Sequence, residues 1–524
     1  MAKLKKDGNH KKSLIFPANR ISRRTFMKQT AAVSIGAGLG LPLSTHSKDA
    51  GSEPIPSLAG IQIQPHNLLD EGVELCLDLL QETAAVNTLF LLSHGYYVAR
   101  GRAPAVLADD HGWTVRDERT RKLPKVWIRH HEKYYQDTSL RHYQNKKEEE
   151  YWNVDIFNNI QKTLRKRGMK IYARLYEPSR LALPDGSGLG WIKNWESVQT
   201  VDIFGQPGRG PCWNNPDYRA WIAATMTDMF SNYELDGLQY GAERVGPLSE
   251  VLYRGIVPAC FCEYCIQRNQ KQGIDAERAK QGYTELYQYI TAAAEKNTLP
   301  PDGLMTTLIR TLLKYHEILA WYYQWFEAEQ EILQMIYKTV KAIKPTAEVG
   351  WHIDHQRSTW DLFYRAAVSY QTMAHHADFI KPILYHEIMG PRMQGWVLAD
   401  WTQRLFKELS AEQILHNFYA LRGYDPKTEP GLDELMQRGF SPEYVYRETK
   451  RLVDGVSGLS KVYAGIGLDI PWNNEPFLSD PASVYQATLR AYAAGADGIV
   501  ISREYDEMRV PGLKAVGRAV REKR

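Results

Sequence analysis

The chain has 524 residues, of which 65 are Lys or Arg and 61 are Asp or Glu, so its formal net charge is +4. Residues 1–50 hold 10 of the basic and 2 of the acidic residues, which leaves 55 basic against 59 acidic residues in the remainder. A near-neutral body offers no electrostatic footprint for a nucleic-acid partner, which we therefore exclude. The 44% hydrophobic and 11% aromatic fractions are typical of a globular protein with a large core.

The first fifty residues predict export. A basic start leads to SRRTFMK, with Arg23 and Arg24, and then to an apolar run at 30–44 that is rich in Gly and Ala. This resembles a twin-arginine signal, which a translocase reads as an address. The run is too short and too weakly apolar to span a bilayer well. We expect a signal peptide and linker over 1–50, a single domain over 51–524, and a soluble periplasmic or secreted protein with no stable membrane span after export. A chance Arg-Arg pair in a basic tail is the alternative.

Eight short apolar segments alternate with helical patterns along the chain. They lie near 60–66, 87–97, 170–178, 235–244, 348–355, 377–387, 461–472 and 497–505. This alternation predicts parallel βα units that close into an α/β fold, a (β/α)₈ TIM barrel. An open doubly wound sheet is the alternative, but no G-x-G-x-x-G follows the first segment. Residues 98–154 and 388–440 are long insertions in βα loops, and we expect the first to be a solvated, charged loop.

Four cysteines form a spaced set. Cys212 stands alone in GRGPCWNNPDYR, whereas Cys260, Cys262 and Cys265 lie in ACFCEYC. Four thiolates are what a closed tetrahedral zinc site requires, and disulfides or plain core cysteines are the alternative. Export of folded protein would let a metal occupy the thiolates before an oxidising compartment could pair them. We expect a structural zinc ion and no organic cofactor, with the fifth cysteine, Cys76, in the core.

Polar residues gather where the predicted strands end. In a barrel the C-terminal ends of the strands converge on one pocket. Buried charges are costly unless they are paired, so this concentration indicates a site built on carboxylates. Glycoside hydrolysis needs two carboxyl groups, one as proton donor and one as nucleophile or base. The strand-end residues are His66, His94, Glu177, Glu243, His355, His386, Glu387, Asp469, Arg503 and Glu504.

The order of the lone cysteine, the fourth-strand Glu243 and CFCEYC resembles the family 42 β-galactosidases over about residues 209–275. That family consists of clan A (β/α)₈ glycosidases with a structural four-cysteine zinc site. Much of the chain from 58 to 510 also resembles uncharacterised bacterial proteins labelled as glycosidases. The resemblance implies that Glu243 is the acid/base of a retaining mechanism.

Two positions depart from the clan A pattern. Ala242 stands where the clan has Asn, and the seventh strand offers Asp469 where the clan has a glutamate nucleophile. We expect Asp469 to be the nucleophile or base, with Glu177, Glu387 and Glu504 as alternatives. Trp472 is the expected sugar platform, because its ring gives contact area at low entropy cost.

The expected function is an exported glycoside hydrolase that cleaves oligosaccharides or glycosides. The side chains expected to bind the carbohydrate are His66, His94, Glu177, Tyr240, His355, His386, Glu387, Trp472, Arg503 and Glu504. Two alternatives stay open. One is a non-catalytic exported carbohydrate-binding barrel, and the other is a metal-dependent hydrolase on the same barrel. The second usually needs H-x-H on the first strand, where this chain has only His66.

Overall fold

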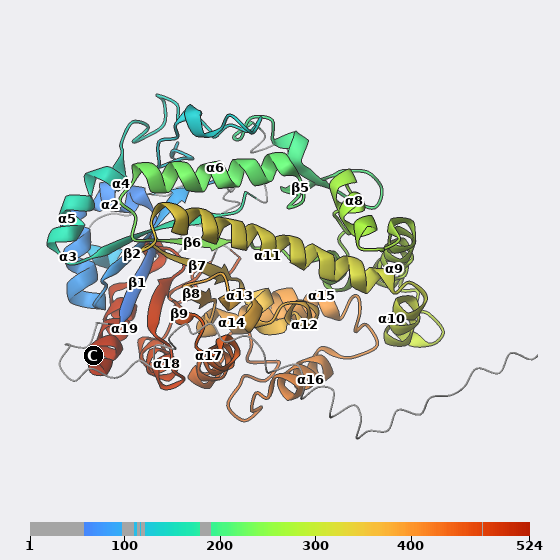
Figure 1. Ribbon diagram of the computed structural model, residues 1–524. Helices are drawn as coiled ribbons and strands as arrows, with labels where there is room; N and C mark the ends of the chain where they lie inside the picture. The colour runs from blue at the N-terminus through green and yellow to red at the C-terminus, as the bar shows by residue number, and fades with distance from the viewer. Residues whose placement is uncertain (1–56, 97–108, 113–115, 117–120, 179–189, 474) are drawn as a thin grey trace, which may run out of the picture. The chain divides into compact units, whose positions relative to one another are not determined.

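The core of the protein is a closed barrel of parallel strands, which confirms the predicted (β/α)₈ fold (Figure 1). The computed structural model describes residues 57–96, 109–112, 116, 121–178, 190–473 and 475–524. Around the barrel the order is β1, β10, β9, β8, β7, β6, β3, β2. The strands are β1 (Leu58–Ile63), β2 (Thr88–His94), β3 (Lys170–Tyr176), β6 (Gly237–Gly241), β7 (Glu348–Ile353), β8 (Phe379–Pro382), β9 (Lys461–Gly467) and β10 (Gly498–Ser502).

A layer of apolar side chains fills the barrel toward the N-terminal ends of the strands. Room for these rings comes from glycine on neighbouring strands: a Cβ added at Gly350 would lie 2.3 Å from the ring of Phe379. The barrel is therefore a packed core at this level and not a pore. The layer consists of Leu58, Phe90, Tyr172, Phe379, Tyr463 and Val500.

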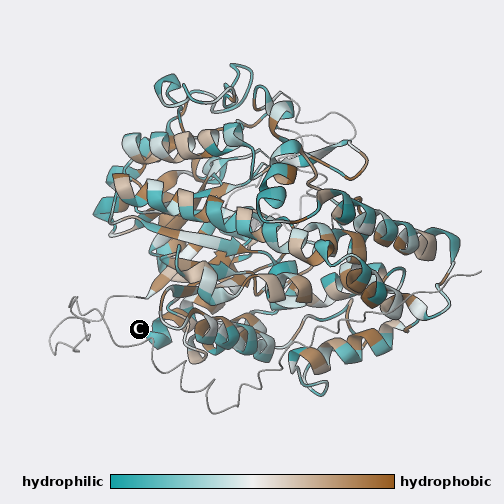
Figure 2. Cartoon of the chain, turned by 45° about the vertical axis from the view of Figure 1, so that its right-hand side comes forward, coloured by the Kyte–Doolittle hydropathy of each residue, from teal (hydrophilic) through white to brown (hydrophobic). Residues whose placement is uncertain are grey.

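Amphipathic helices pack around the strands. Figure 2 shows teal and brown alternating along them, as expected for helices that bury one face. Several begin with a polar cap followed by proline, as where the Asn215 side chain accepts from Asp217 N. The main ones are α3 (Val73–Ala84), α6 (Pro216–Asn232), α11 (Glu317–Ile343), α17 (Pro442–Val456), α18 (Pro481–Ala493) and α19 (Val510–Lys523).

Several connections carry elements of their own. Between β3 and β6 lies a hairpin of β4 (Gln199–Val201) and β5 (Pro207–Pro211). Between β6 and β7 lie α8 (Glu263–Lys271), α9 (Ala276–Lys296) and α10 (Gly303–Lys314), and between β8 and β9 lie α14 (His386–Arg392) and α16 (Ala411–Arg422). These connections leave the C-terminal ends of the strands, where they build the surroundings of the site.

The predicted export signal at residues 1–50 lies outside the described residues. The described residues from 57 onward belong to one compact unit, Pro56–Arg524. In the part of the chain that the structure describes, no helix combines the length and the apolar character needed to cross a membrane.

Candidate active site

A polar layer lies above the apolar one inside the barrel. Gln62, Arg174, Gln239 and Lys381 are all within strands, and each is at most 1% exposed. Gln62 donates to Gln239 across 3.2 Å. The Lys381 stem lies over Gly465, where an added Cβ would be 2.5 Å from its Cε atom. Two basic side chains in a barrel interior are costly in their charged forms unless anions or ligands stand nearby, so this layer marks the site.

Glu243 follows β6 and reaches the open end of the barrel, with 45% of its side chain exposed. His352 Nε2 lies 3.3 Å from Glu243 Oε1, and His352 Nδ1 lies 3.5 Å from Lys381 Nζ. Lys381 Nζ also donates to Tyr385 Oη across 3.0 Å. Burial, followed by the charge of Lys381, lowers the pKa of His352 to about 4, so its ring is neutral at pH 7. A neutral ring can accept from Lys381 and present Nε2–H to Glu243.

Glu504 follows β10, the strand opposite β6 in the barrel order. Arg174 Nη2 donates to both oxygens of Glu504, at 2.9 and 2.7 Å, and Nη1 donates to the Arg503 carbonyl at 3.2 Å. Arg503 itself pairs with Glu507, with Nε 2.9 Å from Oε2. Glu504 is 5% exposed, and the guanidinium of Arg174, whose side chain is fully buried, binds both of its oxygens.

The charges of Glu243 and Glu504 act on shared neighbours. Burial and then Arg174 hold the pKa of Lys381 well below its usual range, while both carboxylates act in the opposite direction. Burial raises the pKa of Tyr176 well above its usual range, and both carboxylates add to that rise. The two acids therefore belong to one electrostatic site at the C-terminal end of the barrel.

Glu177 is the acceptor of a buried network at the rim. It accepts from Trp213 Nε1 at 2.5 Å, Tyr218 Oη at 3.1 Å, Tyr240 Oη at 3.3 Å and Arg244 Nη1 at 3.1 Å. The Glu177 side chain is fully buried. Glu177 and Tyr240, both expected to bind substrate, contact each other in this network. Their role in substrate binding stays a prediction.

The cysteine segment is attached to this network. Arg244 Nη1 donates to the Pro211 carbonyl at 2.8 Å, and its guanidinium lies 4.2 Å from the ring centroid of Trp213. Cys212 lies between Pro211 and Trp213 in the chain. Arg244, next to Glu243, therefore connects the rim of β6 to the cysteine segment.

The four cysteines predicted to bind metal come together. Their sulfur atoms lie within 4.8 Å of one another, and all five cysteines of the chain are free thiols. Cys212 Sγ is 3.4 Å from Cys262 Sγ and 3.5 Å from Cys265 Sγ. With Zn–S bonds of about 2.3 Å, tetrahedral sulfurs lie about 3.8 Å apart, so the set is close to the size a zinc ion requires. The donors fit the metal, and Cys76 is buried as expected.

Asp469 is held by the loops around it. Its Oδ1 accepts from Ser479 N at 2.9 Å and from Arg509 Nη2 at 2.9 Å, and its Oδ2 accepts from Arg509 N at 2.8 Å. The residue is 0% exposed. Its predicted role as nucleophile stays a prediction, and a substrate could reach it only if these bonds opened.

His355 and His386 both contact protein groups. His355 Nδ1 accepts from Arg392 Nη1 at 3.0 Å, and its Nε2 lies 3.2 Å from Tyr444 Oη. His386 Nε2 lies 3.0 Å from Ser483 Oγ and 3.2 Å from the Glu387 carboxylate, a contact that lowers the pKa of Glu387.

The remaining predicted residues lie at different depths. His66 is buried, with Nε2 3.2 Å from Asn67 Nδ2. Trp472 is half-buried, and its ring centroid is 5.6 Å from that of Trp396, which is 47% exposed. His94 lies in a separate group with His130 and His142.

Sequence reasoning missed Arg174, His352 and Lys381, the charged and polar residues inside the strands. A signal was present: in KIYARLY, residues 172, 174 and 176 share one face of the strand, and a cation in the middle of that face is not packing. Asp354, just after β7, was also missed. Burial, with a smaller contribution from Glu243, raises its pKa to about 6.

No protein-family model matches the chain, and no curated protein sequence matches it. Solved structures with a similar fold include the glycoside hydrolase domain of PgaB (BpsB) from Bordetella bronchiseptica, with 12% identity, coverage of 86% of this chain and 94% of that one, and a TM-score of 0.43. The β-galactosidase from Marinomonas ef1 has 8% identity, coverage of 89% and 59%, and a TM-score of 0.46. The catalytic domain of β-amylase from Paenibacillus polymyxa has 9% identity, coverage of 89% and 98%, and a TM-score of 0.46. These structural neighbours are glycoside hydrolases, and likeness at this level describes the fold alone.

Replacing Arg244 with methionine should lower the free energy of unfolding by about 3–5 kcal/mol, because Glu177 would be left as an unpaired buried charge. The matched control is Arg310→Met, since the Arg310–Asp302 pair is more than half exposed at both ends and should contribute at most about 1 kcal/mol. Urea unfolding measures both. Equal losses in the two variants would contradict the role of the Glu177 pair.

Asp354→Asn should stabilise the protein at pH 8 by about 1–3 kcal/mol and have little effect near pH 4. The folded pKa of Asp354, about 6, lies above the value of about 4 in an unfolded chain. Its contribution to stability is therefore present at low pH and is lost as pH rises through 6. Urea unfolding at both pH values tests this, with the exposed Asp137→Asn as control. A destabilised Asp354→Asn variant at pH 8 would refute the sign.

Proposed function

We propose that the protein is an exported glycoside hydrolase in which Glu243 is the proton donor and general base and Glu504 is the second carboxylate. The observation that carries the proposal is an exposed carboxyl group after β6 and a buried, arginine-bound one after β10, at the C-terminal ends of strands on opposite sides of the barrel. The partial resemblance to family 42 supports the role of Glu243.

The surroundings of the two acids suit different roles. Arg174 binds both oxygens of Glu504, and a carboxylate held in this way could attack the anomeric carbon or stabilise positive charge that develops there. Glu243 is open to solvent, where a leaving oxygen could take its proton. Retention requires carboxyl groups about 5–5.5 Å apart and inversion about 6.5–9.5 Å. The family resemblance favours retention.

Asp469 is the alternative for the second role. Its oxygens are engaged by Ser479 and by both the backbone and side chain of Arg509. Removing it should therefore loosen the loop after β9, whereas removing Glu504 should act on turnover directly.

Aromatic rings beside the site fit a carbohydrate substrate. Tyr385, Trp396 and Trp472 lie on or next to the β8–β9 side, and Arg392 lies 4.8 Å from the Trp396 ring and 5.7 Å from the Tyr385 ring. Sugars stack their apolar C–H faces on such rings, so we assign substrate binding to the partly exposed Trp396 and Trp472.

The proposal includes a structural zinc ion held by the four cysteines. Asn214 Nδ2 donates to Cys265 Sγ at 3.3 Å, and Val201 N donates to Cys260 Sγ at 3.4 Å. Such N–H donors support thiolate ligands. The ion would hold the segment that carries Trp213 against the Glu177 network. We also propose export through the twin-arginine translocase to the periplasm or medium, which rests on the sequence of residues 1–50 alone.

Replacing Glu243 or Glu504 with glutamine should abolish hydrolysis of natural-type glycosides, with kcat falling by at least about 100-fold. Glu243→Ala should keep part of its activity on aryl glycosides with good leaving groups, because these need no proton. Glu412→Gln, at an exposed position on α16, is the control. The assay is product release from a panel of aryl glycosides and oligosaccharides.

Two results would overturn this assignment. Full activity in Glu243→Gln would remove the proton-donor role. Sugar binding without turnover in the wild-type protein would favour the non-catalytic barrel. Hydrolysis that persists under chelation would exclude the metal-dependent hydrolase.

Cys262→Ser should remove one zinc ion per chain and lower the melting temperature, whereas Cys76→Ala should keep the zinc because Cys76 lies outside the set. Elemental analysis and thermal unfolding measure the two effects. Mass spectrometry that finds the four cysteines in disulfides in protein without zinc would contradict the metal site.

A further inference from the structure

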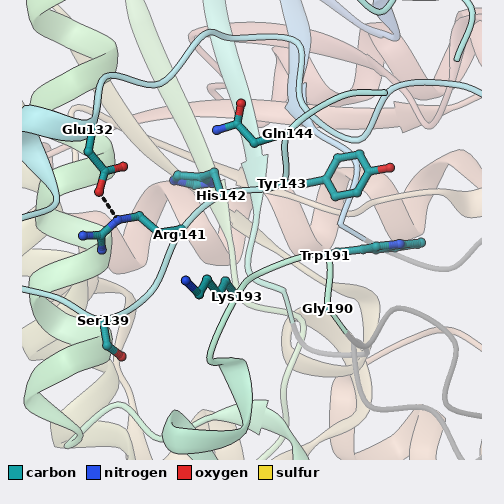
Figure 3. A pocket seen from close by; sticks show the side chains of 9 residues that line it. All are labelled: Glu132, Ser139, Arg141, His142, Tyr143, Gln144, Gly190, Trp191 and Lys193. Carbon is teal, nitrogen blue, oxygen red and sulfur yellow. Dashed lines mark hydrogen bonds and ion pairs between the residues drawn. The ribbon is translucent and has the colours of Figure 1, made fainter. Parts of the chain in front are cut away.

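Three histidines form a second buried group away from the carboxylates. His94 ends β2, and His130 and His142 lie in the connection between β2 and β3. One ring nitrogen from each lies within 4.8 Å of the others. His142 also lines a pocket of about 610 Å³ (Figure 3), which places the group next to solvent.

The protons on His94 follow from its neighbour. Ser93 Oγ donates to the Arg174 carbonyl at 3.0 Å, since a carbonyl can only accept. Its hydroxyl proton is thereby used, so Ser93 Oγ accepts from His94 Nδ1 at 2.9 Å. Neutral His94 therefore carries its proton on Nδ1 and a lone pair on Nε2.

The same reasoning fixes His130. Its Nδ1 lies 3.0 Å from Asp228 Oδ2, and a carboxylate can only accept. Tyr135 Oη lies 2.8 Å from the same nitrogen and 3.3 Å from Asp228 Oδ2, to which it can donate. Neutral His130 thus also carries its proton on Nδ1 and a lone pair on Nε2.

These two Nε2 atoms are 2.7 Å apart. Two lone pairs at that distance repel each other unless a cation lies between them, and the cation is either a proton or a metal ion. The His94 ring is buried and the His130 side chain is 7% exposed, so a cation at this position would have little contact with solvent. Tetrahedral ligands at about 2.0–2.1 Å from zinc lie about 3.3 Å apart, so a shift of about half an ångström in one ring would admit the ion.

His142 can supply a third nitrogen. Thr225 Oγ1 donates to the Trp221 carbonyl at 2.8 Å, so it accepts from His142 Nε2 at 2.9 Å. His142 Nδ1 therefore carries the lone pair, which now accepts from Tyr96 Oη at 2.8 Å. The His142 ring stacks on His130 with centroids 3.7 Å apart, so to bind the ion it would have to turn out of this stack and give up its bonds to Thr225 and Tyr96.

We propose that His94 Nε2, His130 Nε2 and His142 Nδ1 bind one divalent metal ion such as Zn²⁺. Imidazole nitrogens suit zinc, copper and nickel. Asp228 orients His130 from behind, the arrangement that commonly supports metal-binding histidines. The ion would fix the β2–β3 connection to the end of β2, and this site is independent of both the hydrolase proposal and the cysteine set.

The test is a titration of purified full-length protein, stripped with chelator, with Zn²⁺ and then with Co²⁺. Thiolate-bound Co²⁺ gives intense charge-transfer absorption that an ion bound only by nitrogen and oxygen lacks. We expect one ion per chain to bind without producing these bands. Asp228→Asn should weaken its binding about 10–100-fold and leave thiolate-bound metal unchanged. His130→Ala should abolish it, and the exposed His416→Ala should have no effect.

The proposal is wrong if the wild-type protein binds only metal that shows thiolate bands. This outcome does not depend on whether any variant folds. An ion whose affinity is the same in the wild-type, Asp228→Asn and His130→Ala proteins would overturn the proposal as well. A proton shared between His94 and His130, seen by NMR of the imidazole nitrogens in the presence of excess Zn²⁺, is the third contradicting outcome.

Discussion

The buried ion pair of Glu177 and Arg244 determines the geometry of the site. It joins the end of β3 to the residue beside Glu243 and, through the Pro211 carbonyl and the Trp213 ring, to the cysteine segment. The loss of either partner would leave an unpaired charge at a cost of about 3–5 kcal/mol. The backbone that carries Glu243 is thus fixed, while its side chain stays open to solvent.

The polar layer of the barrel supplies the electrostatics. Arg174 and Lys381 replace apolar side chains in the middle of strands, and the two carboxylates stand above them. Arg174 forms an ion pair with Glu504, whereas Lys381 contacts His352 and Tyr385. One acid is therefore buried against a guanidinium and the other is 45% exposed, and such different surroundings are what a donor and a nucleophile require.

The sequence allowed prediction of the barrel because each strand is a short apolar run followed by a helical pattern, and strand ends meet at one edge. It also placed Glu243, Glu504 and the four cysteines correctly at strand ends or in one group. It could not show which loop residues bind Glu177 or Asp469, because such partners can be far away in the sequence. Arg509, which binds Asp469, is 40 residues from it. The connection at 98–154 was expected to be a solvated loop, but its His130 and His142 pack beside His94.

Trapping the reaction intermediate tests the pairing of Glu243 with Glu504 most directly. An activated 2-fluoro glycoside of a sugar that the enzyme cleaves forms a long-lived covalent ester with the nucleophile of a retaining glycosidase. Peptide mapping by mass spectrometry should find the label on Glu504. A label on Asp469, or turnover with no label on any carboxylate, would contradict the account.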